Sequence, residues 1–371
     1  MGFSCGIIGL PNVGKSTIFN ALSSGKAAAA NFPFCTIEPN TGAVAVPDPR
    51  LNKLAELAGS KALIPTQITF VDIAGLIKGA SKGEGLGNQF LGHIKSVDAV
   101  AHVIRCFENA DVVHVEGTVD PIRDAEIIEL ELTLADLELV DKRIDRLAKL
   151  AKSGNKEAQE ETAVLDVLKA HLSQGKSARS LSLDERQIEI SKEILSNLLT
   201  AKPMLYVANV SEAEASTKAD PAGSRPVDKL AKYAANHKSE LVVISGQLES
   251  EISELDPEER KTYLAEAGLE TSGLDRLALA GYKLLDLVTF FTIGPKEAHA
   301  WTMSRGGSAP QAAGKIHTDF EKGFIRAEII GYQDYIDNGT ELKAKEAGKL
   351  RVEGKEYIVQ DGDVVHFRFN V

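Results

Sequence analysis

Short runs of β-forming apolar residues alternate with longer stretches of helical periodicity through most of the chain. The apolar runs occupy residues 3–9, 67–73, 99–106, 203–210 and 240–245. Each connection between them is long enough to hold a helix, as the crossover between parallel strands requires. The pattern therefore predicts an α/β fold with a mostly parallel sheet covered by helices.

Residues 127–151 show a different pattern, that of one long amphipathic helix. Apolar residues recur at spacings of three or four, at Ile127, Leu130, Leu134, Leu137, Ile144, Leu147 and Ala151. Asp141 interrupts this seam, and Ser153-Gly154-Asn155 ends the pattern before residues 157–172 resume it. Ser182 and Glu185 have the spacing of a capping box that would begin a further helix. We expect an inserted helical hairpin at 126–199, because a strand-like run follows at 203–210.

The pattern changes again after about residue 286. Short β-rich runs with turn signals lie at 287–293, 325–330, 357–358 and 364–369. They predict a separate α+β domain over residues 287–371. The two parts 1–125 and 200–286 then form the α/β domain, in which the small and polar residues 211–226 predict a surface loop.

Length and composition limit the number of domains, the kinds of partner and the cellular compartment that fit this protein. The 371 residues suffice for two or three domains. The formal charge is −11, so any contact with nucleic acid must come from a local basic patch. The three cysteines lack metal-ligand spacing and fit a reducing compartment. No apolar run approaches the ~18 residues of a membrane span, and the first residues do not resemble a signal peptide. We therefore expect a cytoplasmic protein that does not enter a membrane.

Residues 9–16, GLPNVGKS, match the phosphate-binding pattern GxxxxGK[ST] between a predicted strand and a predicted helix. Backbone N–H groups of such a loop surround phosphate oxygens at a helix N-terminus. Lys15 would reach the β- and γ-phosphates, and the Ser16 hydroxyl would bind Mg²⁺. The nucleotide-binding residues expected here are Asn12, Val13, Gly14, Lys15, Ser16 and Thr17.

A second candidate motif, DIAGL, begins with Asp72 at the end of a predicted strand. Asp72 could hold the Mg²⁺ shell, and the N–H of Gly75 could approach a γ-phosphate. Thr36 lies between the two motifs and is the candidate second hydroxyl ligand of Mg²⁺. Leu76 stands where Ras-like enzymes carry a water-orienting glutamine. Since an apolar side chain cannot orient water, hydrolysis must use another group or be slow without a partner.

The candidate base-reading segment is Asn209-Val210-Ser211-Glu212, in the place of the Asn-Lys-x-Asp of GTPases. That aspartate accepts hydrogen bonds from guanine, and the lysine lies along the base. The longer Glu212 shifts the acceptor, and Val210 removes the lysine, so we expect the guanine preference to be lost. Ser245 lies in the last loop on the base side.

These motifs resemble those of one family. Residues 9–16, 31–40 (NFPFCTIEPN), 72–91 (DIAGLIKGASKGEGLGNQFL) and 209–212 resemble the YchF-type Obg-like ATPases, which belong to the translation-factor-related P-loop GTPases. Residues 309–326 (APQAAGKIHTDFEKGFIR) are similar to the TGS domain of that family, a ubiquitin-like module also found in threonyl-tRNA synthetases.

The resemblance implies an Obg-type G domain, an inserted coiled-coil hairpin and a C-terminal TGS domain. It also implies an enzyme that binds ATP rather than GTP and associates with the ribosome through its large subunit, with a monomer as the expected state. In this family a histidine is thought to replace the missing glutamine from a mobile loop, and the matching residue is His114. Asn12 matches the asparagine with which related GTPases hold K⁺ beside the phosphates.

Other readings stay open at this stage. Lys315, His317, Lys322 and Arg326 crowd one stretch near Trp301 and could contact RNA, or could form a solvated face. A GTPase of the same fold, a non-catalytic RNA-binding adaptor that uses nucleotide structurally, and a small-molecule kinase are the alternatives to an ATPase switch.

Overall fold

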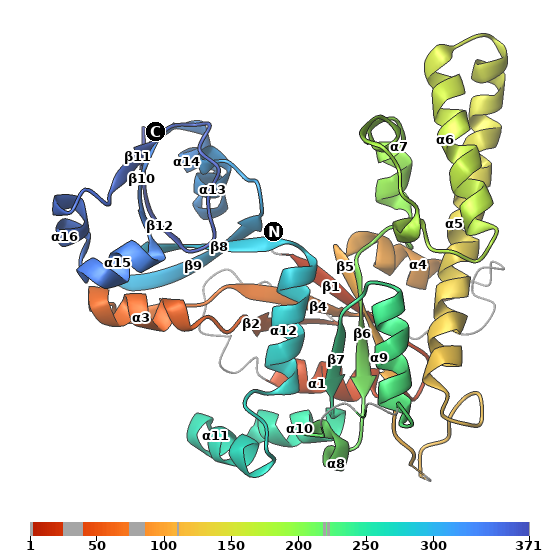
Figure 1. The fold of residues 1–371 in the computed structure, drawn as a ribbon, viewed down its shortest axis with the longest axis horizontal. Coiled ribbons are helices and arrows are strands. Elements are labelled where there is room, and N and C mark those ends of the chain that lie inside the picture. The colour runs from red at the N-terminus through yellow and green to blue at the C-terminus, as the bar shows by residue number, and fades with distance from the viewer. Residues whose placement is uncertain are drawn as a thin grey trace.

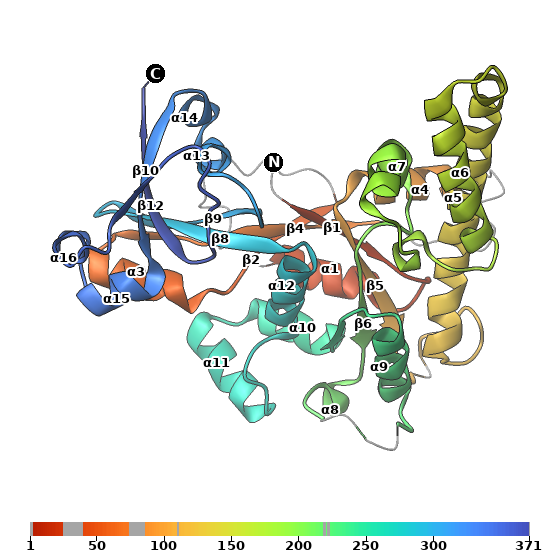
Figure 2. The same ribbon diagram turned by 45° about the horizontal axis from the view of Figure 1, so that its top comes forward.

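The computed structural model describes residues 3–24, 40–73, 86–109, 111–217, 220 and 223–370. These residues form two six-stranded sheets and a helical hairpin. Figures 1 and 2 place the hairpin at one end of the molecule and the second sheet, which holds the C-terminus, at the other.

The first sheet confirms the mostly parallel α/β fold. Its order is β2 (Thr41–Ala45), β4 (Gln67–Asp72), β1 (Ser4–Ile8), β5 (Ala99–Arg105), β6 (Met204–Asn209) and β7 (Leu241–Ile244). All neighbouring pairs are parallel except β2 with β4. Every residue of β5 and β6 is buried, which explains why these strands are largely apolar in the sequence. The helices around this sheet are α1 (Lys15–Ser24), α4 (Leu86–Ser96), α8 (Glu212–Ala215), α9 (Pro226–Asn236), α10 (Gly246–Glu254), α11 (Pro257–Glu266) and α12 (Gly273–Leu284).

The expected hairpin consists of α5 (Pro121–Lys152) and α6 (Lys156–Leu172), followed by η2 (Ala178–Ser180) and α7 (Glu185–Asn197). The predicted apolar seam is wrong in its first half, because Leu130 and Leu134 are 51% and 42% exposed. There α5 packs on the α/β core through Ala125, Ile128 and Leu132 instead.

Two further details of the hairpin region differ from the sequence predictions. The capping box of α7 is formed by Asp184 and Gln187, not by Ser182 and Glu185. Residues 211–226, expected to be a loop, include the short helix α8, and α9 begins at Pro226.

The second sheet has the order β11 (Arg351–Glu353), β10 (Phe324–Gly331), β12 (Asp363–Phe369), β8 (Leu287–Ile293), β9 (Glu297–Ser304) and β3 (Ala62–Ile64). Its helices are α13 (Ala309–Ile316), α14 (Thr318–Lys322), α15 (Tyr332–Asn338) and α16 (Glu341–Glu346). The predicted strand at 357–358 is reduced to one isolated bridge, between Ser308 and Ile358. β3 comes from the N-terminal half, as does α3 (Pro49–Ala58), whose Leu51 and Leu54 pack in the core of this part.

The topology positions the candidate site. Because β1, β4, β5, β6 and β7 are parallel, their carboxyl ends meet at one edge of the first sheet, where ligands of open α/β sheets bind. That edge carries the predicted phosphate loop, Asp72, Asn209 and Ser245. Within the described ranges, no helix is both long and apolar enough to cross a bilayer.

Candidate nucleotide-binding site

The phosphate loop joins β1 to α1 as predicted. Asn12 has a φ of 61°, a left-handed conformation that asparagine tolerates. Gly14 has a φ of 96°, and a Cβ there would lie 2.1 Å from Nδ2 of Asn209. A side chain at position 14 would therefore displace Asn209, which explains the requirement for glycine.

Lys15 is buried, and its ammonium donates hydrogen bonds to the carbonyls of Gly9 (2.9 Å) and Leu10 (2.7 Å). Burial lowers the pKa of Lys15 to about 8, against the opposing effect of the Asp72 carboxylate. Burial raises the pKa of Asp72, and Lys15 partly offsets that rise. An added negative charge, such as a phosphate, would therefore stabilise the Lys15 ammonium. An added positive charge, such as a metal ion, would stabilise the Asp72 carboxylate.

Asn209 ties three segments of the site together. Its Nδ2 donates to the carbonyl of Val13 at 2.9 Å, and its Oδ1 accepts the N–H of Gly246 at 2.9 Å. Asn209 is buried, and both ends of its amide are used within the protein. Its role here is to fix the phosphate loop against the loop that follows β7.

A cavity of about 910 Å³ opens beside these loops. Most of the predicted binding residues line it, namely Asn12, Gly14, Lys15, Ser16, Thr17, Asn209, Val210, Glu212 and Ser245. Val13 lies beneath the loop, 1% exposed. Thr36 and Gly75, together with Leu76, lie outside the described residues.

Sequence reasoning missed two groups of lining residues. Phe107, Glu108 and Asn109 follow β5, while Ser250 and Glu251 lie on α10. Their position after the carboxyl ends of β5 and β7 was the available signal, but no motif distinguishes them. Arg105, 1% exposed, explains how the loop after β5 is held: its guanidinium donates to the carbonyls of Phe107, Asn109 and Val112.

His114 does not line the cavity. It is buried rather than solvated, and its Nε2 lies 2.9 Å from Oδ2 of Asp124 on α5. The N–H of Glu116 donates to Nδ1 at 3.2 Å, so the hydrogen-bond pattern assigns the ring proton to Nε2. Arg123 binds the other oxygen of Asp124 at 2.9 Å.

The phosphate loop contacts this histidine loop directly. Nδ2 of Asn12 donates to the carbonyl of Val113, the neighbour of His114, at 3.2 Å. Asn12, which lines the nucleotide cavity, is therefore hydrogen-bonded to the loop that carries His114.

The described residues offer hard oxygen donors for a metal ion. These are the Ser16 hydroxyl at the exposed start of α1 and the half-buried Asp72 carboxylate at the end of β4. No group of three or more His, Cys, Asp or Glu suited to a metal occurs in the described ranges. This donor set fits Mg²⁺, which takes one or two protein oxygens together with phosphates and waters.

Comparison with known proteins bears directly on this site. A family model described as a 50S ribosome-binding GTPase matches residues 4–210, and the model for the C-terminal part of YchF GTPases, described as a protein of unknown function, matches residues 287–370. The ribosome-binding ATPase YchF of Bacillus subtilis is 54% identical over 371 residues, with all of both chains covered. The chain belongs to the YchF family.

Further relatives agree with this membership. The ribosome-binding ATPase YchF of Haemophilus influenzae is also 54% identical, again over the full length of both chains. The solved structure of the Schizosaccharomyces pombe YchF GTPase superposes with a TM-score of 0.88 at 38% identity, covering 99% of this chain and 98% of that one. The resemblance stated from the motifs is thus confirmed, as is the P-loop GTPase fold with a YchF C-terminal part.

Proposed function

We propose that this chain is a Mg²⁺-dependent ATPase that acts as a nucleotide-controlled switch on the ribosome. The observation that supports it most is the cavity in which the phosphate loop and the segment Asn209–Glu212 face one space. The full-length relatives named ribosome-binding ATPases supply the reaction and the partner.

The preference for ATP is argued from the base side of the cavity. Val210 is 2% exposed and brings no charge to the base, while Glu212 lines the cavity from the start of α8. Glu212 replaces the aspartate that accepts hydrogen bonds from the ring N–H and the amino group of guanine in GTPases. With the acceptor shifted by the longer side chain, the ring N–H of guanine would stay unpaired.

Dissociation constants for ATP and GTP, measured with Mg²⁺ present, test this preference. We expect ATP to bind at least as tightly as GTP. The combination Val210→Lys with Glu212→Asp should move the preference toward GTP. A tenfold preference of the wild type for GTP, about 1.4 kcal/mol, would instead identify a GTPase of the same fold.

For hydrolysis we propose His114 in place of the glutamine. Since its ring is held by Asp124 outside the cavity lining, the loop after β5 must rearrange before the imidazole can act on water. K⁺ at Asn12 would add positive charge beside the phosphates. Multiple-turnover phosphate release with and without K⁺ separates this enzyme from an adaptor that uses nucleotide only structurally.

For the ribosome we propose the hairpin 126–199 and the C-terminal TGS domain 287–371 as recognition elements of a cytoplasmic monomer, directed at the large subunit and its RNA. Both project from the α/β part at opposite ends (Figure 1). Ribosome pelleting with ATP, with a non-hydrolysable analogue and without nucleotide should show nucleotide-dependent association. Equal pelleting in all three conditions would contradict the switch.

A further inference from the structure

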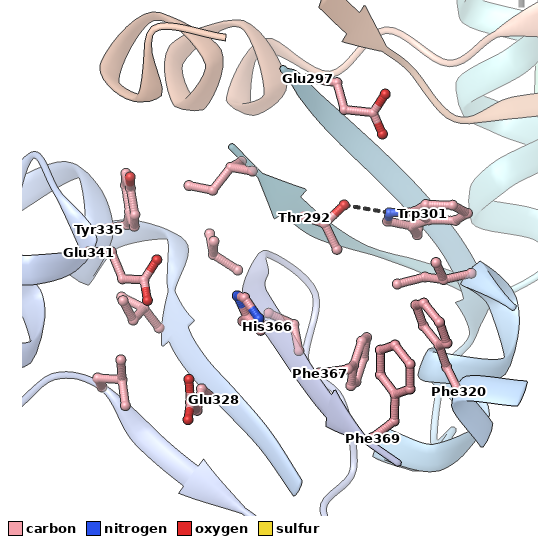
Figure 3. A pocket seen from close by; sticks show the side chains of 16 residues that line it. Thr292, Glu297, Trp301, Phe320, Glu328, Tyr335, Glu341, His366, Phe367 and Phe369 are labelled. Carbon is pink, nitrogen blue, oxygen red and sulfur yellow. Dashed lines mark hydrogen bonds between the residues drawn. The ribbon is translucent and has the colours of Figure 1, made fainter. Parts of the chain in front are cut away.

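The second sheet is split between two of its strands. β8 and β9 pair at seven positions, and β10 and β12 also pair at seven, but β8 and β12 meet only at Phe291 and Val364. From Val365 to Phe369, the edge of β12 that faces β8 has no strand partner in the part of the chain described. Figure 3 shows the two pairs of strands diverging around the space between them.

A cavity of about 330 Å³ fills this split. Its wall on one side is aromatic, formed by Trp301, Phe320, Phe367 and Phe369 (Figure 3). Phe320 and Phe369 are stacked with ring centres 3.7 Å apart. The indole of Trp301 donates to Oγ1 of Thr292 at 2.8 Å and stacks on His299 at 3.7 Å. The rings are thus held in place before any ligand arrives, which lowers the entropy cost of binding.

The charged groups of this cavity are acidic. Glu297, Glu328 and Glu341 line it, and no lysine or arginine is among the lining residues. Glu328 is neutralised by Arg368 at 2.9 Å and Arg326 at 3.3 Å.

Glu297 and Glu341 are exposed and form no ion pair with a lysine or arginine within the described residues. His299 lies 3.8 Å from Glu297, but burial lowers the pKa of His299 to about 4, so this histidine is neutral at pH 7. Two exposed carboxylates without a direct ion pair to lysine or arginine in the described part of the chain therefore flank an aromatic wall and a free strand edge.

We propose that this split is a docking groove for an extended segment of another protein that carries lysine or arginine beside apolar residues. The segment adds as a strand to the free edge of β12, which at about 3.3 Å per residue accommodates four or five residues. Its apolar side chains contact the aromatic wall, and its cations face Glu297 and Glu341. A nucleic acid strand fits less well, because its phosphates would lie against these carboxylates. The proposal is independent of ATP hydrolysis.

Trp301 makes the groove directly observable, because it is the only tryptophan of the chain. The probes are a capped hexapeptide of alternating lysine and valine, its glutamate–valine counterpart and a uridine hexanucleotide. With the full-length protein, the lysine peptide should change Trp301 emission saturably and protect the indole from acrylamide. The other two probes should leave the emission unchanged.

The matched variants are Glu297→Lys with Glu341→Lys, and Glu356→Lys as a control that reverses an exposed charge outside the lining residues. The double variant should bind the lysine peptide at least tenfold more weakly. It should also reverse the order in which caesium and iodide quench the fluorescence of Trp301. The control should behave as the wild type, and unchanged thermal midpoints show that all variants fold.

Three results would overturn the proposal. One is the absence of a saturable response to the lysine peptide up to about 1 mM. Another is equal binding of this peptide by the wild type and the double variant. The third is saturable binding of the uridine hexanucleotide at the groove, which would make this surface an RNA-binding face.

Discussion

At the scale of single residues, the histidine loop is held at three points. Arg105 donates hydrogen bonds to three of its carbonyls, Asn12 donates to the carbonyl of Val113, and Asp124 accepts from His114. The sequence marks His114 by its similarity to the family motif, but nothing in the sequence indicates the contact with Asp124, ten positions away on a helix. Side chains that meet only through the tertiary fold are the part of a site that pattern reasoning cannot supply.

The Asp124 contact leads to a kinetic prediction. If His114 acts on water as proposed, Asp124 holds it away from the cavity. Asp124→Asn should then raise the single-turnover hydrolysis rate at saturating ATP by up to about tenfold, because a charge-assisted hydrogen bond is replaced by a neutral one. His114→Ala should lower the same rate by about 10²–10⁴-fold with ATP affinity nearly unchanged.

Asp111→Asn is the matched control, since Asp111 is an exposed acid in the same loop. It should leave the rate unchanged. A slower Asp124→Asn enzyme would mean that Asp124 orients His114 during the reaction. Equal rates for the wild type and His114→Ala would remove the histidine from the mechanism.

Lys15 leads to a pH prediction. Its pKa of about 8 in the nucleotide-free protein means that the ammonium is protonated below pH 8 and loses its proton above it. Phosphates favour the charged form, so binding above pH 8 must take up a proton. The dissociation constant for ATP should be nearly flat from pH 6.5 to 7.5 and should weaken by up to about tenfold per pH unit above 8.

Calorimetry at pH 9 in two buffers of different ionisation enthalpy measures the proton uptake directly. Lys15→Arg keeps its charge throughout this range and should remove the uptake. Proton uptake that persists in Lys15→Arg would assign it to another group.

At the scale of elements, the sequence is most informative where the burial of an element is uniform. The central strands β5 and β6 are buried on both faces and were predicted as apolar runs to within one residue at each end. The edge strands β2, β3 and β11 and the half-exposed strand β9 lack a prediction, because strands that are not buried on both faces do not form continuous apolar runs and carry a weak signal. The long helix α5 was predicted, but its buried face was not. The first part of α5 packs on the first sheet and the later part packs on α6. One regular apolar stripe along the helix cannot face both of these partners.

The point where α5 changes partner is fixed by Asp136. Its buried carboxylate accepts the N–H groups of Leu199 and Thr200 and the Thr200 hydroxyl, at 2.6–2.8 Å. Asp136→Ala should lower the free energy of unfolding by about 3 kcal/mol, because three buried donors lose their acceptor. Urea unfolding followed by circular dichroism measures this loss.

Asp141→Ala is the control on the same helix. Asp141 pairs with Lys169 across the hairpin at 2.7 Å, but both side chains are nearly half exposed, so the loss of this pair should lower the free energy of unfolding far less than Asp136→Ala does. Similar losses for the two variants would show that Asp136 does not anchor the hairpin.

At the scale of the whole molecule, one segment of the N-terminal half packs with the C-terminal part. Residues 49–64 precede β4 in sequence, yet α3 and β3 pack with the C-terminal part. β3 pairs with β9, and Arg50 binds Asp361 at 2.7 Å. The domain boundary predicted at residue 287 from the sequence therefore leaves this segment with the α/β part. The pattern of apolar and polar residues within 49–64 cannot reveal this packing, because the pattern is the same whichever hydrophobic core the segment joins.

This packing predicts how the protein can be divided. A chain that ends at residue 286 should self-associate, because α3 would expose Leu51 and Leu54, which contribute about 1.5–3 kcal/mol each when buried. Residues 47–65, which contain α3 and β3, can be removed without disturbing the first sheet. The N–H of Val46 donates to the carbonyl of Thr66 at 2.9 Å, and β2 is antiparallel to β4, so the two ends of the removed segment already lie side by side. Replacing residues 47–65 by an Asn-Gly turn closes that hairpin.

Sedimentation velocity and ATP binding distinguish the two shortened chains. The chain with the Asn-Gly turn should be monomeric and should bind ATP as the full-length protein does, because every described residue that lines the nucleotide cavity remains. The chain that keeps residues 47–65 should sediment as larger species. If both were monomeric and equally stable, the contact of α3 and β3 with the second sheet would contribute little, and the boundary at 287 would divide the molecule in space as well as in sequence.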